Sequence, residues 1–519
     1  MIAMRCARVI VAPLVVPAVT LALLAGCTVG PNFVRPVARA PAHWAAQPSA
    51  PPADSPDTPA AAPQLSTVNE QATELGQWWT DFKDPTLSSL TERSLRANLD
   101  LRAAVLRIET ARAQRDVTAA AFWPTLGADA SYTRERLSET TPTGALFSSV
   151  GTIKFPSGAS LSIPNPYNQF QLGLAASWEI DLFGRVRRAV EAADASVAAS
   201  IEDQRAVQVA LLADVAQSYI AVRGAQSDVR VAQQNLATID ELLELTRARR
   251  AAGMVTQIDV STASAQASAT RADLPRFELQ ITQNINQLSQ LLALAPEALR
   301  AELVIEAPVP ALPPDLPIGL PADLARRRPD IREAEANLHV ATAQIGVAVA
   351  DLFPRLTLSA SGGFQSETAN QLLEWASRFG SLGPTLELPI FDRGRWKSVR
   401  LDNLRAQEAV VGYERTVLNA LHEVENALAA YRADQERRAW LAAAVAQDAD
   451  ALTLARQRYE NGVANFTDVL NVQRTLQQNE AALNDATTAV ATDLVRLYRA
   501  LGGGWQYPYD AAATAAIEH

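Results

Sequence analysis

The feature that most constrains this chain is an internal duplication. Residues 99–104 (LDLRAA) parallel residues 329–334 (PDIREA), and the triplet at 122–124 parallels the triplet at 352–354. The agreement continues in the same order through residues 178–185 and 386–395, and then through residues 247–260 and 456–469. A duplication with so long a period predicts one unit of helices and strands used twice, at residues 85–295 and 321–503.

Each copy begins with a helix and continues into two strands. The helices are expected at residues 85–122 and 321–353, where Pro124 and Pro354 stop them because proline cannot continue the hydrogen-bond ladder. Apolar and polar residues then alternate along segments that begin at Leu126, Phe170, Leu356 and Leu382. These segments approach the roughly 9–11 residues of a tilted membrane strand. Alternation alone also fits a small soluble sheet.

Strands that span a membrane would have a further consequence for assembly. Lipid excludes an open sheet edge, and closed barrels need at least about eight strands. One chain supplies only four, whereas three chains would supply twelve. A membrane-spanning interpretation therefore predicts a homotrimer.

Each pair of strands leads into a very long helical tract. Residues 185–250 and 395–460 contain almost no proline, and each tract stops near a glycine, Gly253 or Gly462, before a return helix. Helices of this length cannot form the interior of a compact domain, and they predict a coiled-coil-like tube. The predicted fold class is mainly α, with a membrane β part.

The first residues predict export and lipid attachment. A basic start and an apolar run over residues 1–26 form a secretory signal peptide that ends in Leu-Ala-Gly-Cys, a tetrad that resembles the bacterial lipobox. Cys27 would then carry lipid, although a plain signal peptide with a chance cysteine is the alternative. Residues 27–84 are expected to form a tether, residues 296–320 a linker between the copies, and residues 504–519 a tail.

Composition excludes several functional classes. The net charge is −10 with no basic cluster, which argues against a nucleic-acid partner. The four histidines are scattered and the only cysteines are Cys6 and Cys27, so no metal or cofactor spacing is present. No phosphate-binding loop or nucleophile arrangement occurs either. We therefore expect neither a cofactor nor an enzyme.

Several of these motifs together resemble a known family. The sequence CTVGPNF at residues 27–33, the DLFGR turn at 181–185 and the paired Gly-x5-Asp-Val patterns at 253–260 and 462–469 look like the TolC-like outer-membrane factors. The NodT-type lipoprotein branch, which serves resistance-nodulation-division efflux pumps, is the most similar. The resemblance covers nearly all of the mature chain. By resemblance to other lipoproteins, Thr28 after the cysteine favours the outer membrane.

The resemblance implies a fold and a set of partners. The fold would be a trimeric twelve-stranded β-barrel in outer-membrane lipid, continuous with a periplasmic α-helical barrel. The partners would be a periplasmic adaptor and an inner-membrane pump. The chain would then be the passive exit duct for small molecules such as drugs, toxic compounds or metals.

The resemblance also marks a periplasmic gate where the long helices reverse. Asp468 matches the first acid of the family's Asp-Val-Leu-Asp pattern, whereas Asn471 replaces the second. Asp259 is the equivalent position in the first copy, and Tyr459 matches an aromatic that ties neighbouring coiled coils together in the closed state. The alternative is that both aspartates only face solvent or cap the return helices.

Two other functions remain open from the sequence. The same fold serves type I protein secretion, in which the exported cargo is a protein. A periplasmic coiled-coil adaptor lipoprotein would also be helical and exported, but it would have no membrane strands. The duplicated alternating segments disfavour the adaptor. Nothing in the sequence identifies the substrate.

Overall fold

The structure is a computed structural model that describes residues 28–37, 40–45, 67–69, 75–142, 145, 152–154, 160–162, 165–313 and 315–507. The chain divides into two compact units. The described residues of the first fall within Met1–Val34, Thr110–Val197 and Asn337–Ala409, and those of the second within Arg35–Glu109, Ala198–Ala336 and Val410–His519. The predicted signal peptide and Cys27 lie outside the described residues.

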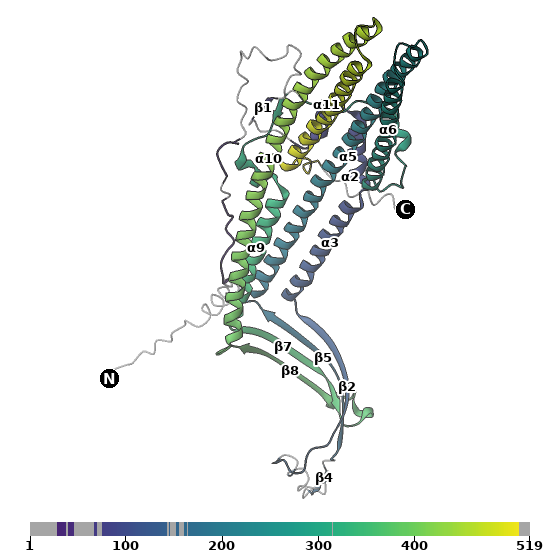
Figure 1. Cartoon of the computed structure of the whole chain (residues 1–519). Coiled ribbons are helices and arrows are strands. Elements are labelled where there is room, and N and C mark those ends of the chain that lie inside the picture. The colour runs from purple at the N-terminus through teal and green to yellow at the C-terminus, as the bar shows by residue number, and fades with distance from the viewer. Residues whose placement is uncertain are drawn as a thin grey trace, which may run out of the picture. The chain divides into compact units, whose positions relative to one another are not determined.

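The first unit contains an antiparallel four-stranded sheet. Its strands lie in the order β2 (Thr125–Glu135), β5 (Tyr167–Ile180), β7 (Arg355–Ser366) and β8 (Arg378–Glu387), as Figure 1 shows. Each strand therefore covers the segment in which alternation predicted one. The insert between β2 and β5 contains a small hairpin of β3 (Thr152–Lys154) and β4 (Ser160–Ser162).

The register of this sheet sorts the side chains by polarity. Leu126 pairs with Ala176, Ala176 with Ala360, and Ala360 with Leu382, so these four residues lie in one row on one face. Successive residues of a strand point to opposite faces of the sheet. With these registers, one face carries mostly apolar residues and the other mostly polar ones. The apolar face includes Ala128, Ala130, Tyr132, Phe170, Leu172, Leu174, Trp178, Leu356, Leu358, Phe364, Pro384 and Leu386. The polar face includes Asp129, Ser131, Thr133, Gln169, Gln171, Ser177, Thr357, Ser359, Ser361, Gln365, Ser381 and Thr385.

The long helices occur where the sequence predicts them. They are α5 (Arg185–Ala251) and α10 (Arg393–Glu460), followed by the return helices α6 (Gln257–Leu291) and α11 (Phe466–Ala500). Gly253 and Gly462 follow the long helices in the left-handed region, with φ of 72° and 76°, which favours glycine. No helix among the described residues combines the length and the apolar character that crossing a membrane requires.

The shorter helices differ from the prediction, because each of the two expected helices is divided. The first becomes α2 (Pro85–Ala97) and α3 (Leu99–Ala119), followed by the 3-10 turn η2 (Ala120–Phe122). Asn98 separates α2 from α3, since its side-chain amide donates to the carbonyl of Leu291 and its side-chain oxygen accepts from the N–H of Leu101. The second becomes η3 (Pro321–Asp323), α8 (Leu324–Arg327) and α9 (Pro329–Ala350). Pro329 sits at the break, where it lacks the donor that would continue α8.

The second unit is held together by an aromatic core that includes the end of the expected tether. The 3-10 helix η1 (Trp78–Phe82) buries Trp78, Trp79 and Phe82. Two tyrosine hydroxyls fix this segment: Tyr498 donates to Asp81 at 2.7 Å, and Tyr219 donates to Asp84 at 2.6 Å. Burial and the contact with Asp84 raise the pKa of Tyr219 to about 12, so the hydroxyl keeps its proton.

The expected linker and tail also join this unit. The linker contains α7 (Arg300–Leu303) and β6 (Asp315–Pro317), and β6 pairs in parallel with β1 (Thr67–Asn69) of the tether. Trp505 lies beneath the guanidinium groups of Arg205 and Arg332, at 4.6 and 5.1 Å from its ring centroid. The second unit therefore includes parts of segments that the sequence suggested were irregular.

Candidate functional site

The turn between α5 and α6 is closed by a capping box. The backbone N–H and the hydroxyl of Thr256 both donate to a carboxylate oxygen of Asp259, each at 2.8 Å. The N–H of Asp259 donates back to the Thr256 hydroxyl at 3.3 Å. Asp259 therefore satisfies donors that the first turn of a helix would otherwise leave unpaired.

The turn between α10 and α11 repeats this arrangement more loosely. The backbone N–H of Asn465 donates to Asp468 at 3.2 Å, and the Asp468 side chain is exposed. Asn471 lies one turn further along α11 and is also exposed. Asp259 and Asp468 thus both cap the return helices, which is the role that the sequence offered as the alternative to gating. Capping occupies part of each carboxylate and leaves Asp468 accessible to ions.

Tyr459 lies beside these turns, at the end of α10, and is buried. The Arg249 guanidinium, from the end of α5, lies 4.2 Å from its ring centroid. Arg249 also donates to the backbone carbonyls of Tyr459 and Glu460, at 2.7 and 2.8 Å. These carbonyls belong to the last turn of α10, which lacks partners within the helix, so a cation there is stabilising.

One apolar cluster holds the two turns together. Tyr459 packs edge-on against Phe466 at 6.0 Å, within a cluster that draws residues from α5, α6, α10 and α11. The structure therefore brings Tyr459 close to the turn that carries Asp468. Sequence reasoning did not single out Arg249; the available signal was the basic run at the end of the first long helix, at residues 247–250.

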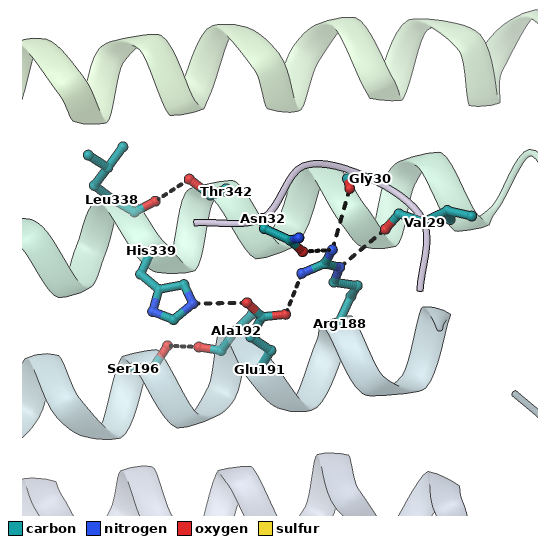
Figure 2. Close-up of polar contacts among 10 residues, drawn as sticks. All are labelled: Val29, Gly30, Asn32, Arg188, Glu191, Ala192, Ser196, Leu338, His339 and Thr342. Carbon is teal, nitrogen blue, oxygen red and sulfur yellow. Dashed lines mark hydrogen bonds and ion pairs between the residues drawn. The ribbon is translucent and has the colours of Figure 1, made fainter. Parts of the chain in front are cut away.

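A second candidate site holds the segment that follows Cys27. Residues 28–33, which we call the strap, lie against α5 and α9 (Figure 2). The Arg188 side chain on α5 is buried, and it donates to the carbonyl of Val29 at 3.2 Å and to the side-chain oxygen of Asn32 at 2.7 Å. Arg188 also donates to the carbonyl of Gly30 at 3.4 Å and pairs with Glu191 at 2.7 Å. A charged side chain thus anchors a segment without regular secondary structure.

His339 and Phe33 complete the contacts made by Arg188 and Glu191, and we call these four residues the clamp. The Phe33 ring stacks on His339 at 4.4 Å, and the His339 Nε2 lies 2.9 Å from the second oxygen of Glu191. Burial alone would raise the pKa of Glu191, but the hydrogen bonds from His339 and Arg188 hold that pKa below its usual value. Glu191 therefore stays ionised between its two partners.

Glycines allow the strap to approach so closely. A Cβ on Gly30 would lie 2.6 Å from the Cα of Gly346 on α9, and a Cβ on Gly184 would lie 2.8 Å from the side chain of Thr28. The Val29 N–H also donates to the carbonyl of Phe183 at 3.1 Å. The DLFGR turn at residues 181–185, which contributed to the resemblance, therefore forms part of the surface on which the strap packs.

Comparisons with known proteins agree with this architecture. The family model described as outer membrane efflux protein matches residues 90–294 and 320–503. The outer membrane protein OprJ of Pseudomonas aeruginosa is 35% identical over 496 residues, covering 94% of this chain and 96% of OprJ. The probable efflux pump outer membrane protein TtgC of Pseudomonas putida is 33% identical over 490 residues, covering 94% of this chain and 95% of TtgC.

Solved structures show the same fold. The outer-membrane channel OprN matches with a TM-score of 0.79 and 34% identity, covering 92% of this chain and all of the OprN chain. The MtrE outer membrane channel of Neisseria gonorrhoeae, in its open state, matches with a TM-score of 0.73 and 29% identity, covering 93% of this chain and 100% of that one.

These matches identify the class of protein. The chain belongs to the outer membrane efflux protein family, whose model covers most of both predicted copies. More particularly, it is an outer-membrane efflux channel protein that extends into the periplasm and serves as an exit duct. This function belongs to transport rather than to catalysis.

Proposed function

We propose that three copies of this chain close a twelve-stranded barrel in the outer membrane and a helical tube in the periplasm. The observation that carries the proposal is the four-stranded sheet with one apolar and one polar face. Its outer strands, β2 and β8, have no further strand beside them among the described residues. Pairing β8 of one copy with β2 of the next would satisfy those edges, as lipid requires.

The exposed side chains support a membrane position for the sheet. On the apolar face, Leu126, Leu174 and Leu382 are 72%, 53% and 76% exposed in the single chain. Large apolar side chains also flank the end of the sheet that joins the helices, where Trp123 and Phe391 are 74% and 85% exposed. Aromatic residues at the rim of an apolar band are typical of the interface between membrane and water.

The polar face would then line the duct. Its serine, threonine, glutamine and aspartate side chains suit a water-filled passage for solutes of many kinds. We propose that a periplasmic adaptor and an inner-membrane pump supply the solutes and the energy, and that the chain conducts small molecules passively. The similarity to TtgC, a probable efflux pump outer membrane protein, supports this assignment over protein secretion.

We also propose that Cys27 carries lipid. The strap begins one residue after Cys27 and is fixed by Arg188 and the DLFGR turn, so the anchor would start beside the membrane end of the first unit. Labelled palmitate is expected to enter the wild-type protein and not Cys27→Ser. Equal labelling of both proteins would refute lipid attachment at this cysteine.

The helical turns are the proposed gate. Threefold symmetry would bring three copies of Asp468 toward one axis, with Asp259 and Asn471 near them. Carboxylates at about 6 Å repel by roughly 3 kcal/mol per pair at an effective dielectric near 20, so a closed aperture needs bound cations or compensating contacts. Arg249 and Tyr459 link the two turns of one chain and would stabilise the closed arrangement.

Purified protein in planar lipid bilayers tests the duct itself. We expect stepwise single-channel conductance that requires the trimer and disappears when the trimer is dissociated by heat. Inserted trimers that carry no current, both in the wild type and in an Arg249→Met variant with a loosened turn, would refute the proposed function.

A further inference from the structure

An acidic cavity in the second unit has no role in the duct described above. It has a volume of about 440 Å³ and is lined by residues of α5, α6, α10 and α11. Four aspartates line it, and Arg496 is the one basic side chain in its lining. The acids are Asp228, Asp434, Asp485 and Asp493. The cavity therefore carries more carboxylates than its own lining can neutralise.

Asp493 is the acid that most needs a partner. Its side chain is only 3% exposed, and one of its oxygens accepts from Arg496 at 2.8 Å. The other oxygen, Oδ2, is buried and has no hydrogen-bond donor among the described residues. A buried carboxylate oxygen without a donor or a cation is costly, so something that the chain does not itself supply is expected there.

Asp434, on α10, faces Asp493 across the helix interface. Its carboxylate comes within hydrogen-bonding reach of Asp493, whereas its ion pair with Arg437 is long, at 3.9 Å. Two carboxylates cannot bond to each other without a proton or a cation between them. The facing carboxylates of α10 and α11 therefore need a proton or a cation between them.

The raised pKa values of two acids of the cavity, Asp493 and Asp228, indicate the same excess of negative charge. Burial raises the pKa of the Asp493 carboxyl, and the facing Asp434 adds to the increase. Burial also raises the pKa of Asp228 to about 6, and the charge of Asp485 contributes. The Arg276 guanidinium acts on Asp228 in the opposite direction. Negative charge thus accumulates here beyond what the nearby guanidinium groups compensate.

We propose that this cavity binds a hard divalent cation, Ca²⁺, with Asp434 and Asp493 as direct ligands. The lining offers carboxylate, hydroxyl and amide oxygens but no imidazole or thiolate, and that donor set is the one Ca²⁺ prefers. The buried hydroxyl of Thr488 also has no partner among the described residues and lines the same cavity. The bound ion would fasten α10 to α11.

Water must complete the coordination. Within the described part of the chain, no three acidic, histidine or cysteine side chains are grouped closely enough to hold a metal by themselves. Ca²⁺ takes about 6–8 oxygen ligands in flexible geometry, and each water needs roughly 30 Å³. The cavity volume leaves room for the ion and several waters, so a site built on two carboxylates is sufficient.

Equilibrium dialysis of the detergent-solubilised protein with radioactive Ca²⁺ tests the proposal. All proteins carry Asp468→Ala, which removes the acid proposed to bind cations at the gate. We expect one saturable Ca²⁺ per chain, and binding about tenfold weaker or worse in Asp434→Asn, whose amide can donate to Asp493 in place of the ion. Asp240→Asn, a change at an exposed acid on α5 that pairs with Arg271 at 3.2 Å, should bind like the parent.

Three results would overturn the proposal. The first is no saturable Ca²⁺ binding by the parent protein, which needs no variant to interpret. The second is equal binding by the parent and by Asp434→Asn or Asp493→Asn. The third is a thermal midpoint of unfolding that rises at low pH but does not change with Ca²⁺. That result would show that the two carboxylates share a proton instead. None of these results bears on whether the chain conducts solutes.

Discussion

Replacing Arg188 with methionine should release the strap while the remainder of the protein stays folded. Methionine retains much of the apolar length of the side chain but removes every donor. The carbonyls of Val29 and Gly30 and the amide oxygen of Asn32 lose the donor that Arg188 supplies. Glu191 loses one of its two partners. The loss falls on the strap because it is a short segment that can leave the surface without unfolding the helices.

The size of the effect follows from these contacts. A hydrogen bond that involves a charged group contributes roughly 1.5–3 kcal/mol. Two such bonds, to Val29 and Asn32, and a longer one of 3.4 Å to Gly30 hold the strap directly. The free energy of undocking should therefore fall by about 3 kcal/mol or more. Since every 1.4 kcal/mol is about tenfold in an equilibrium constant, the undocked population should rise by about two orders of magnitude.

Hydrogen exchange measured by mass spectrometry reads this population directly. The N–H of Val29 is protected by its bond to the carbonyl of Phe183, so the peptide that contains it should exchange about a hundredfold faster in Arg188→Met. Arg115→Met is the matched control, because it also removes an arginine that pairs with an acid of α5, Asp194 at 2.8 Å. Unchanged protection of the strap in Arg188→Met, or equal loss in both variants, would refute the clamp.

Three further predictions concern the cavity, the sheet and the turns. Protonation of Asp228 favours the folded state fully below about pH 4, and this contribution is lost as the pH rises through about 6, so Asp228→Asn should raise the thermal midpoint at pH 7.5 and not at pH 4. Leu172→Arg on the apolar face should cost the trimer roughly 2–4 kcal/mol, measured by its melting in detergent, whereas Gln171→Arg on the polar face beside Asp129 should cost much less. Asp468→Ala should weaken the block of single-channel current by polyvalent cations, and Arg249→Met should raise the resting conductance; unchanged block and conductance would mean that the turns do not gate.

Much of the fold was predictable because it depends on local and periodic signals. The four strands follow from alternation, and their common apolar face follows once Leu126 is aligned with Leu382 through the two central strands. The long helices follow from runs without proline that end at Gly253 and Gly462. The capping role of Asp259 was also foreseeable, since a threonine stands three residues before it.

The remainder depends on contacts between residues far apart in the chain. The strap partners Arg188 and His339 lie on separate helices, and nothing around either residue in the sequence indicates a clamp. The segment Trp78–Phe82 falls within the predicted tether, although its cluster of aromatic residues is a usable signal for a core. The sequence does not indicate that the carboxylates of Asp434 and Asp493 face each other, because only the packing of α10 against α11 brings them together.

Disulfide cross-linking between β2 and β8 tests the central claim most directly. In one chain these strands are separated by β5 and β7, so at about 4.8 Å per strand they lie roughly 14 Å apart, beyond the limit of about 7 Å between Cα atoms for a disulfide. A cysteine at Leu382 combined with one at Leu126, Ala128 or Ala130 can therefore link only different copies. We predict that oxidation in the outer membrane gives a closed covalent trimer for one of these pairs and for neither single variant. Failure of all three pairs to cross-link, or linkage that stops at dimers when oxidation is complete, would contradict the trimeric barrel.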